Sequence, residues 1–231
     1  MNIYIRISEN QKSISGDDRW NSYDKRMILK KCWLSLMANI TIEDSLHVFH
    51  HDVSDKTLKW LEEKCETLIT FTQIKSIEDS FKIPLEILTK DLKEEQNPDK
   101  LFALLEDDYL WNTKGLDAIK KTSNYWKGFI SPSDTPLNYK NPRFSKIFVG
   151  VDRHWRTTNY ISWNLIGNTK IFLKYVDQIK ESGILLDKNK LNNILQETDC
   201  INPLPAVATH CKNNDMSPLV DWGYVWRGIE I

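Results

Sequence analysis

The chain has 231 residues, of which 41% are hydrophobic and 11% aromatic, so it can bury a sizeable core as one large domain or two small ones. Its 31 basic and 32 acidic residues give a net charge of −1, which supplies no overall electrostatic reason to expect nucleic acid or an anionic membrane as a partner. No two of its 8 glycines lie closer than five positions apart, which excludes a dinucleotide-binding GxGxxG motif and a GxSxG nucleophile elbow, and no GxxxxGK[ST] phosphate-binding loop occurs in the sequence.

The first hundred residues alternate between strand and helix patterns. Ile3, Ile5 and Ile7 alternate with other residues at the N-terminus, as in a half-buried strand. Ser54 is a candidate N-cap for a following helix. The expected elements are a strand over residues 1–8, a helix over 23–37, a strand over 46–50, a helix over 55–65, a strand over 68–74 and a helix over 80–95.

The second half continues the alternation and then becomes irregular. The expected elements are a strand over residues 101–105, a helix over 116–125, a short strand over 129–131, a strand over 147–151 and a helix over 162–179. A proline-containing loop covers residues 133–142. From residue 202 onward the pattern predicts an irregular tail that ends in an aromatic segment.

The alternation of strands and helices predicts an α/β sandwich with a mostly parallel central sheet. Ligands bind such sheets outside the carboxyl ends of the strands. Three predicted strands end in polar or charged residues, namely Arg6 with Ser8, His51 with Asp52, and Glu106 to Asp108. We therefore expect these residues to converge on one edge of the sheet, where the site should lie.

The location of the protein is predicted from what the sequence lacks. The longest uncharged apolar runs, such as 101–105 and 147–151, fall far short of the roughly 18 residues of a membrane-spanning helix. The N-terminus is typical of a strand rather than a signal peptide. The four cysteines are scattered without a CxxC pair, which favours reduced thiols. We expect a cytoplasmic protein, or one in the host cytoplasm if it is viral, with no membrane partner.

Glu106, Asp107 and Asp108 follow the apolar strand directly, and three adjacent acids raise one another's pKa unless a cation compensates them. A divalent cation would do so, because Mg²⁺ and Mn²⁺ take carboxylate oxygens and complete their shells with phosphates and water. The alternative is a solvated turn whose acids lie near the start of a helix.

The segment FALLEDDYLW at 102–111 resembles the acidic DXD-type motif of GT-A glycosyltransferases. Other blocks are similar to small bacterial and phage glycosyltransferase-like proteins. They are IYIRIS near the N-terminus with the later Arg19 and Lys25, LHVFHHDVSD at 46–55, FISPSDTPLNY at 129–139, FVGVDRHWRTT at 148–158 and PAVATHCKNNDMSPLVDW at 205–222. The resemblance implies a single Rossmann-like GT-A domain over 1–231. Its nucleotide-binding half would be 1–111, and its acceptor-side half 112–231, with the C-terminal tail closing the site.

The resemblance also implies roles for individual residues. Arg6, Ser8, Lys25 and Asp52 would bind the nucleotide-sugar, together with Glu106 and Asp107. Asp108 would coordinate Mn²⁺ or Mg²⁺, and His210 would complete the metal shell. Imidazole suits Mn²⁺ better than Mg²⁺. A buried or capping histidine is the structural alternative for His210.

Residues 152–158 include several side chains that can take part in catalysis. Arg153 or Arg156 could stabilise a diphosphate leaving group, and Asp152 or His154 could remove the proton of an acceptor hydroxyl. Asp134 is a second candidate base. The structural alternatives are a surface ion pair beside a core tryptophan for the first group, and a turn residue after Pro132 for Asp134.

These features predict a metal-dependent glycosyltransferase that uses a nucleotide-sugar, with UDP as the expected nucleotide. The acceptor would be a saccharide or, given the basic stretch over residues 139–156, a hydroxymethylated base in phage DNA. Trp111, Trp126, Trp155 and Trp163 flank the expected site, where indoles could stack on sugars or bases. One rival is a nuclease or phosphoesterase in which Glu106 to Asp108 and His210 gather two metals. Another is a non-catalytic tryptophan-rich binding module.

Overall fold

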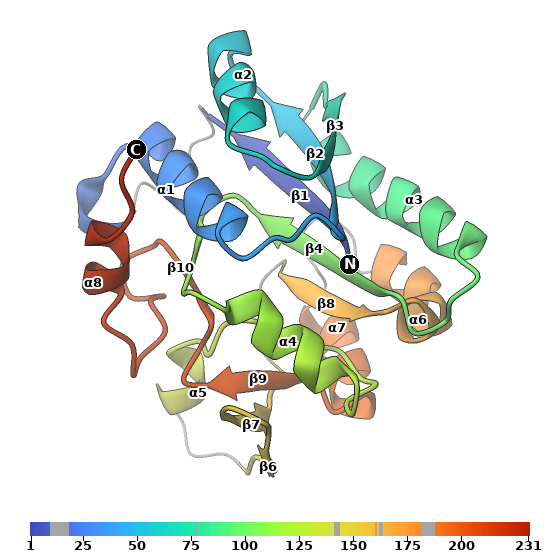
Figure 1. Ribbon diagram of the computed structural model, residues 1–231. Coiled ribbons are helices and arrows are strands. Elements are labelled where there is room, and N and C mark those ends of the chain that lie inside the picture. Colours follow the sequence, from blue (N-terminus) through green and yellow to red (C-terminus); the bar gives the residue numbers. More distant parts are fainter. Residues whose placement is uncertain (10–18, 77, 141–143, 160, 162–163, 182–187) are drawn as a thin grey trace.

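The computed structural model describes residues 1–9, 19–76, 78–140, 144–159, 161, 164–181 and 188–231. Five strands of these residues form the central sheet: β1 (Asn2–Ser8), β2 (Ser45–His51), β3 (Leu68–Gln73), β4 (Leu101–Glu106) and β8 (Leu165–Asn168). Their order is β3-β2-β1-β4-β8 (Figure 1). The first four are parallel, and β8 runs antiparallel to β4. The predicted mostly parallel sheet is confirmed.

Side chains of β1 enter the core on both faces of the sheet. Ile3, Ile5 and Ile7 belong to one buried cluster, whereas Tyr4 belongs to another. Successive residues of a strand point to opposite faces, so the first strand supplies both clusters. Burial on both faces is the usual state of a parallel sheet that helices cover on both sides.

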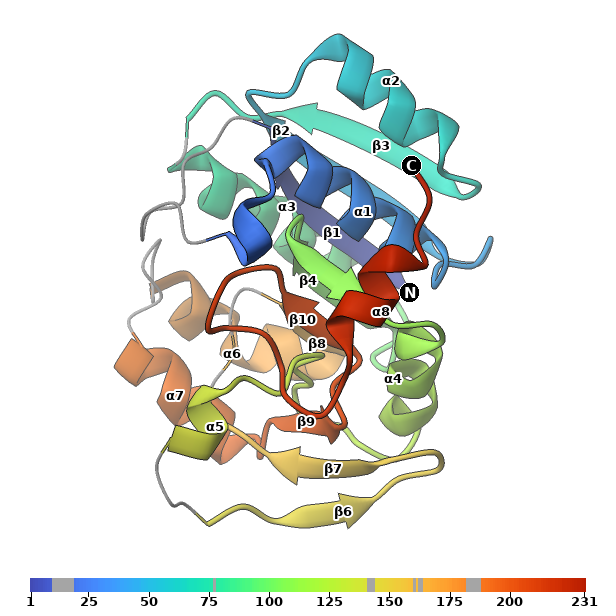
Figure 2. The ribbon, with the colours of Figure 1, turned by 90° about the vertical axis from the view of Figure 1, so that its left-hand side faces the viewer.

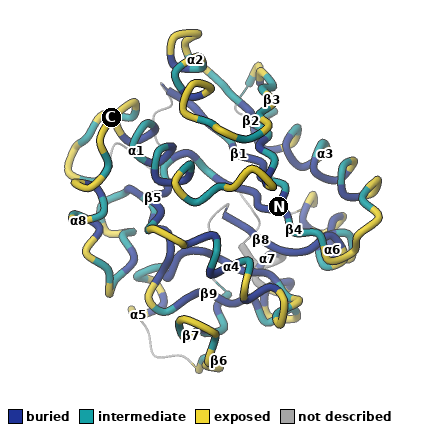
Figure 3. Tube along the Cα trace, in the orientation of Figure 1, coloured by how far each residue is buried: buried dark blue, intermediate teal, exposed yellow. Residues whose placement is uncertain are grey.

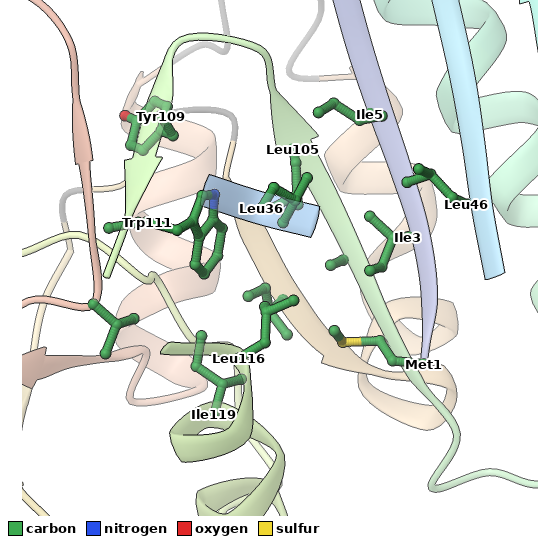
Figure 4. Packing of buried hydrophobic residues seen from close by; sticks show 14 of the residues in the cluster. Met1, Ile3, Ile5, Leu36, Leu46, Leu105, Tyr109, Trp111, Leu116 and Ile119 are labelled. Atoms are coloured by element: carbon green, nitrogen blue, oxygen red, sulfur yellow. The ribbon is translucent and has the colours of Figure 1, made fainter. Parts of the chain in front are cut away.

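Helices α1 (Lys25–Met37), α2 (Asp55–Glu63) and α4 (Gly115–Ser123) contribute to the first cluster. Leu36 of α1 and Leu116 of α4 lie with Ile3 in this core (Figure 4). Burying each large apolar side chain contributes roughly 1.5–3 kcal/mol, so this packing is a main source of stability on that face.

Helices α3 (Asp79–Glu94), α6 (Thr169–Glu181) and α7 (Lys188–Glu197) supply the second cluster. Leu88, Phe172 and Leu195 pack there with Tyr4. Figures 1 and 2 show α1 and α3 on opposite sides of β1. The predicted α/β/α sandwich is therefore confirmed.

Further short elements lie beside this sandwich. They are η1 (Trp20–Ser22), β5 (Tyr109–Trp111), α5 (Leu137–Lys140), β6 (Ile147–Val149), β7 (His154–Thr157), β9 (Ile201–Leu204), β10 (Ala208–His210) and α8 (Trp222–Arg227). Among the described residues, β6, β7 and β9 form one small sheet, and β5 pairs with β10. The second of these pairings is important for the site, because it brings the end of the chain to the edge of the main sheet.

The predicted helix over 162–179 is wrong at its start. Leu165–Asn168 form β8 and α6 begins only at Thr169, while residues 162–163 lie outside the described part of the chain. All four residues of β8 are buried, and the strand pairs with Leu101–Leu104 of β4. A short apolar run next to a helical pattern does not reveal this, because the pairing partner is about sixty residues away.

The predicted irregular tail is also wrong in part, since β9, β10 and α8 all fall after residue 200. In contrast, the predicted strand over 129–131 is reduced to isolated bridges, in which Ile130 pairs with Ile166 and with Ile201. The strand predicted over 147–151 ends at Val149. β6 pairs with β7, which follows it directly, whereas the bridges of Ile130 depend on distant partners; all of these short pairings carry little local periodicity.

Burial decreases from the central sheet outward. In Figure 3 the traces of β1 and β8 are largely buried, whereas α2 is exposed along its outer side. No helix in the described ranges is long and apolar enough to span a membrane.

Candidate active site

Strand pairing brings the predicted polar residues to one edge of the sheet. In the parallel register, Ser8 lies beside His51, and Arg6 lies beside Glu106. Asp52 follows directly in the chain, and so do Asp107 and Asp108. The carboxyl ends of β1, β2 and β4 therefore meet, as expected for a ligand site in a sheet of this kind.

His210 reaches this edge through the antiparallel pairing of β10 with β5. The register places His210 opposite Tyr109, and the two rings stack with centroids 5.1 Å apart. The amide of Cys211 donates a hydrogen bond of 2.8 Å to the carbonyl of Asp108. The imidazole Nε2 lies 3.3 Å from Asp108 Oδ2. The structure thus brings together the two side chains that the sequence predicted as metal ligands.

Each acid of the triplet contacts a cation of the chain. Arg6 pairs with Glu106, and Lys25 Nζ lies 2.5 Å from Asp107 Oδ1 and 3.8 Å from Asp108 Oδ2. The Asp107 carboxylate also accepts a hydrogen bond of 2.8 Å from the Ser8 amide. The triplet is therefore not a solvated turn, because its charges are partly neutralised by buried groups from β1 and α1.

Burial is the largest influence on the ionisation of the triplet. It raises the pKa of Glu106 against the attraction of Arg6, and it raises the pKa of Asp107 against that of Lys25. Burial would also raise the pKa of Asp108, but His210 and Lys25 hold that pKa far below its usual range. Burial lowers the pKa of His210, but Asp108 outweighs it and raises that pKa well above its ordinary value. The cluster is rich in negative charge and favours cations.

Asp108 also provides a test of whether a metal suits the site. Its Oδ1 is buried and has no hydrogen-bond partner among the residues that the structure describes, which is costly unless a ligand takes it up. A carboxylate oxygen beside an imidazole nitrogen suits Mn²⁺. The described residues hold no group of three His, Cys, Asp or Glu side chains arranged around one metal position. Phosphate oxygens and water would therefore complete the shell, as is common for ions of this kind, and the residues fit such a metal.

A hollow of about 540 Å³ lies beside the triplet, at the carboxyl ends of β2 and β3. Its lining residues are His50, His51, Asp52, Val53, Ser54, Gln73, Ile74 and Lys75. Asp52 turns the chain out of β2 with a φ of 49°, a left-handed conformation that Asp tolerates better than most residues. Because Ser8 pairs with His51 and binds Asp107, the hollow and the triplet form a continuous edge.

Glu9, which the sequence analysis missed, holds the rim of this hollow. Its carboxylate accepts hydrogen bonds of 2.9 Å from the Ser54 amide and 3.0 Å from the Thr57 hydroxyl, and it pairs with Arg26 of α1. Ser54 is the N-cap of α2, as predicted. An acid at the end of the first strand was the available signal, but it adjoins a loop without periodicity.

Asp215 is a second residue that the sequence analysis missed. Its Oδ2 lies 3.6 Å from His210 Nδ1, on the other side of the ring from Asp108. An acid five positions after a candidate metal ligand was the only signal, and it lies in an irregular polar segment. The imidazole is thus placed between two carboxylates.

Asp134 and Arg156 are brought together, but as an ion pair. Asp134 is 0% exposed and accepts hydrogen bonds from Asn138 Nδ2 at 3.0 Å and from the Tyr139 hydroxyl at 2.5 Å, besides its pairing with Arg156. Burial and the bond to Asp134 raise the pKa of Tyr139 to about 12. The oxygens of this carboxylate are thus already occupied by three donors of the chain. This arrangement favours a structural role for Asp134.

Asp152, Arg153 and His154 do not join the triplet. Asp152 pairs with Arg153 at 3.4 Å, and the guanidinium of Arg153 also donates to the Pro205 carbonyl at 3.3 Å. His154 is exposed at the start of β7. In Figure 2 the strands β3 and β7 point to the same side of the molecule, so the turn that precedes β7 lies away from the carboxyl edge of the sheet.

The tryptophans near the predicted site are largely core residues. Trp111 is 2% exposed and Trp155 1% exposed, and Trp126 packs against Phe148 with ring centroids 4.9 Å apart. Trp163 lies outside the described residues. These indoles therefore offer little free surface for stacking on a ligand.

The chain is similar to several solved structures of distant sequence. Mouse xyloside xylosyltransferase 1, in its apo form, is 11% identical; 86% of this chain and 82% of that chain are covered, with a TM-score of 0.44. The galactosyltransferase LgtC, solved with donor and acceptor sugar analogues, is 15% identical; 87% and 72% are covered, with a TM-score of 0.44.

Another similar structure is that of 4-diphosphocytidyl-2C-methyl-D-erythritol synthase from Anaerococcus prevotii. It is 9% identical and covers 97% of this chain and 93% of that chain, with a TM-score of 0.46. No protein-family model and no curated protein matches the chain. Likeness at this level concerns the course of the backbone, and the chemistry has to be judged from the site itself.

Proposed function

We propose that the protein is a metal-dependent glycosyltransferase that moves a sugar from a nucleoside-diphosphate-sugar, with UDP as its nucleotide, to a hydroxyl acceptor. The observation that supports this most is Asp108, whose buried Oδ1 lacks a partner while its Oδ2 lies 3.3 Å from His210. A carboxylate oxygen without a partner, beside an imidazole at the carboxyl ends of the strands of an α/β sheet, suits a metal that also binds phosphates.

Asp108 and His210 would hold the Mn²⁺ or Mg²⁺ ion, which when bound neutralises charge on a diphosphate leaving group. Lys25 and Arg6 keep the neighbouring carboxylates of Asp107 and Glu106 in place through their ion pairs. Because Lys25 lies within 3.8 Å of Asp108, it also limits how much negative charge faces the ligand. The site can therefore receive a diphosphate together with its metal.

The nucleoside would occupy the hollow at the ends of β2 and β3. Asp52 and Gln73 line it and can accept or donate hydrogen bonds to a base or ribose. Arg6 and Ser8, at the adjoining end of β1, lie between the hollow and the triplet in the sheet register. This placement supports the roles that the resemblance to GT-A enzymes implied for these residues.

A saccharide is the acceptor that the charges favour. The basic stretch that suggested DNA is largely neutralised, because Lys146 pairs with Asp199 at 2.8 Å, Arg153 with Asp152 and Arg156 with Asp134. Arg143 lies outside the described residues. A surface of paired charges gives little of the phosphate attraction on which DNA binding depends. Arg156, whose buried Nε has no hydrogen-bond partner, is the arginine that we assign to the acceptor side.

The rival functions have less support. A two-metal nuclease would need the oxygens of Glu106 and Asp107 for metals, but these pair with Arg6 and Lys25. A tryptophan-rich binding module would need exposed indoles, whereas Trp111 and Trp155 are buried.

Calorimetric titration of UDP with and without Mn²⁺ tests the proposal. We expect Mn²⁺ to strengthen UDP binding, and Asp108→Asn to abolish that gain. Asp117→Asn is a matched control, because Asp117 is an exposed acid that pairs with Lys121 at 2.7 Å on α4. Release of UDP from a panel of UDP-sugars, followed with saccharide acceptors, then tests turnover. Cleavage of DNA or phosphoesters without any nucleotide-sugar binding would contradict the proposal.

A further inference from the structure

His210 contacts a carboxylate through each of its ring nitrogens. Nε2 lies 3.3 Å from Asp108 Oδ2, and Nδ1 lies 3.6 Å from Asp215 Oδ2. The ring is also held flat against Tyr109, with only 3° between the two planes. Its position and the direction of both nitrogens are therefore fixed by three neighbours from two segments of the chain.

The loop after β10 is folded so that Asp215 returns to the ring. The Thr209 hydroxyl accepts a hydrogen bond of 2.7 Å from the Ser217 amide, and this bond closes the loop. Inside it, the Asp215 amide donates to the Lys212 carbonyl at 3.1 Å. Ser217 Oγ lies 3.0 Å from Ser133 Oγ, which ties the loop to the body of the protein. Asp215 thus faces His210 because of bonds that its own side chain does not make.

The two nitrogens of a neutral imidazole have different roles, and the partner of one decides the role of the other. When a metal takes Nε2, the proton of a neutral imidazole has to lie on Nδ1, and a carboxylate at Nδ1 favours that arrangement. Metal-binding histidines are commonly oriented in this way, and loss of the outer partner typically weakens metal binding by about 10–100-fold.

We propose that Asp215 is a positioning residue that holds the His210 ring with Nε2 facing Asp108, so that both side chains can reach one metal ion. This inference rests on the proposed metal-dependent function and adds to it the residue that sets the metal affinity. Asp215 is 43% exposed at its side chain, so an isolated ion pair at this position would contribute little to stability. Its effect should therefore be visible in metal binding rather than in folding.

A double-mutant cycle tests the inference, with Mn²⁺ alone as the probe and calorimetry as the readout. We expect Asp215→Ala to raise the Mn²⁺ dissociation constant about 10–100-fold in the otherwise native chain. In the His210→Ala background the same change should have no further effect, because it acts through the imidazole. Asp117→Ala is the matched control, and Asp215→Glu should restore part of the affinity. Equal losses in both backgrounds would overturn the inference.

A second readout needs no substrate. Zn²⁺ is a diamagnetic ion that imidazole binds well, and nitrogen-15 NMR should show that it shifts the Nε2 resonance of His210 while Nδ1 keeps its proton. Asp215→Ala should weaken that response, and Asp215→Asn can replace that variant if it folds poorly. A Zn²⁺ response that is the same with and without Asp215 would overturn the inference even if sugar transfer occurs. Failure to transfer sugar would contradict the proposed function but leave the metal-binding result standing.

Discussion

Two aspartates at opposite ends of the central sheet show how a structural acid differs from a candidate ligand. Asp44, just before β2, is 3% exposed and accepts from the N-terminal amine at 2.9 Å, from Lys120 at 2.7 Å and from the Thr41 amide at 2.9 Å. Asp108, at the other end, is partly buried; among the described residues it contacts cations through Oδ2, and its buried Oδ1 has no hydrogen-bond partner there.

The two aspartates differ in whether both carboxylate oxygens have a hydrogen-bond partner, and not in their charge. Every oxygen of Asp44 has a donor, so the energy of its bonds is already realised in the folded state. An unpartnered oxygen on Asp108 is a cost to folding that a ligand can remove, which is how functional sites commonly depart from structural ones. The comparison predicts that changes at Asp108 affect function and changes at Asp44 affect stability.

The largest effect should come from Asp108→Asn. We expect a loss of Mn²⁺-supported sugar transfer by a factor of about 10²–10³, because the carboxylate that would hold the metal is gone. The melting temperature should fall less than in Asp44→Ala, because the carboxylate that the change neutralises pairs with His210 and Lys25 but is 29% exposed at its side chain. Initial rates with UDP-sugar and Mn²⁺, together with calorimetric melting, measure both. A stable, fully active variant would show that the unpartnered oxygen has no catalytic importance.

Asp44→Ala should have the opposite profile. It leaves the N-terminal amine and Lys120 without their shared carboxylate, and breaking a buried ion pair costs roughly 3–5 kcal/mol. Urea unfolding should show that loss in the free energy of unfolding, whereas UDP binding by the folded fraction should stay unchanged. An equal loss of binding and stability would remove the distinction between the two ends of the sheet.

The loss of stability at low pH should next show the contribution of Asp44. Burial would raise the pKa of Asp44, but its bonds from Lys120 and Thr41 outweigh it and lower that pKa below its unfolded value. This carboxylate therefore stabilises the fold above the unfolded pKa of about 4, and that stability is lost as the pH falls through the lower, folded pKa. Urea titrations between pH 6 and pH 2, in roughly one-unit steps, should show a shallower loss for Asp44→Asn.

The smallest effects are expected in the turn before β7. Asp152→Asn and His154→Ala change exposed side chains away from the carboxyl edge, so the free energy of unfolding should change by less than about 0.5 kcal/mol. Turnover should also be nearly unaltered. If either variant lost activity as Asp108→Asn does, the base predicted from the sequence would lie in this turn after all.

Much of the central fold follows from local sequence patterns. The alternation of Ile3, Ile5 and Ile7 predicted β1, and the apolar run before Glu106 predicted β4. Periodicity failed at Leu165–Asn168, because four buried residues fit a strand or a helix equally well. Pairing with β4 decides that case, and it involves residues that are remote in the chain.

The candidate site, too, could be predicted from the sequence only in part. The sequence by itself determined that polar residues end three neighbouring strands, because strand direction and sheet type follow from short-range alternation. Only the tertiary structure decided which charges meet. Lys25 reaches Asp107 across 82 positions, His210 reaches Asp108 across 102, and a closed loop returns Asp215 to the imidazole. Contacts of such separation depend on how helices and loops pack on the sheet, which no local pattern of residues encodes.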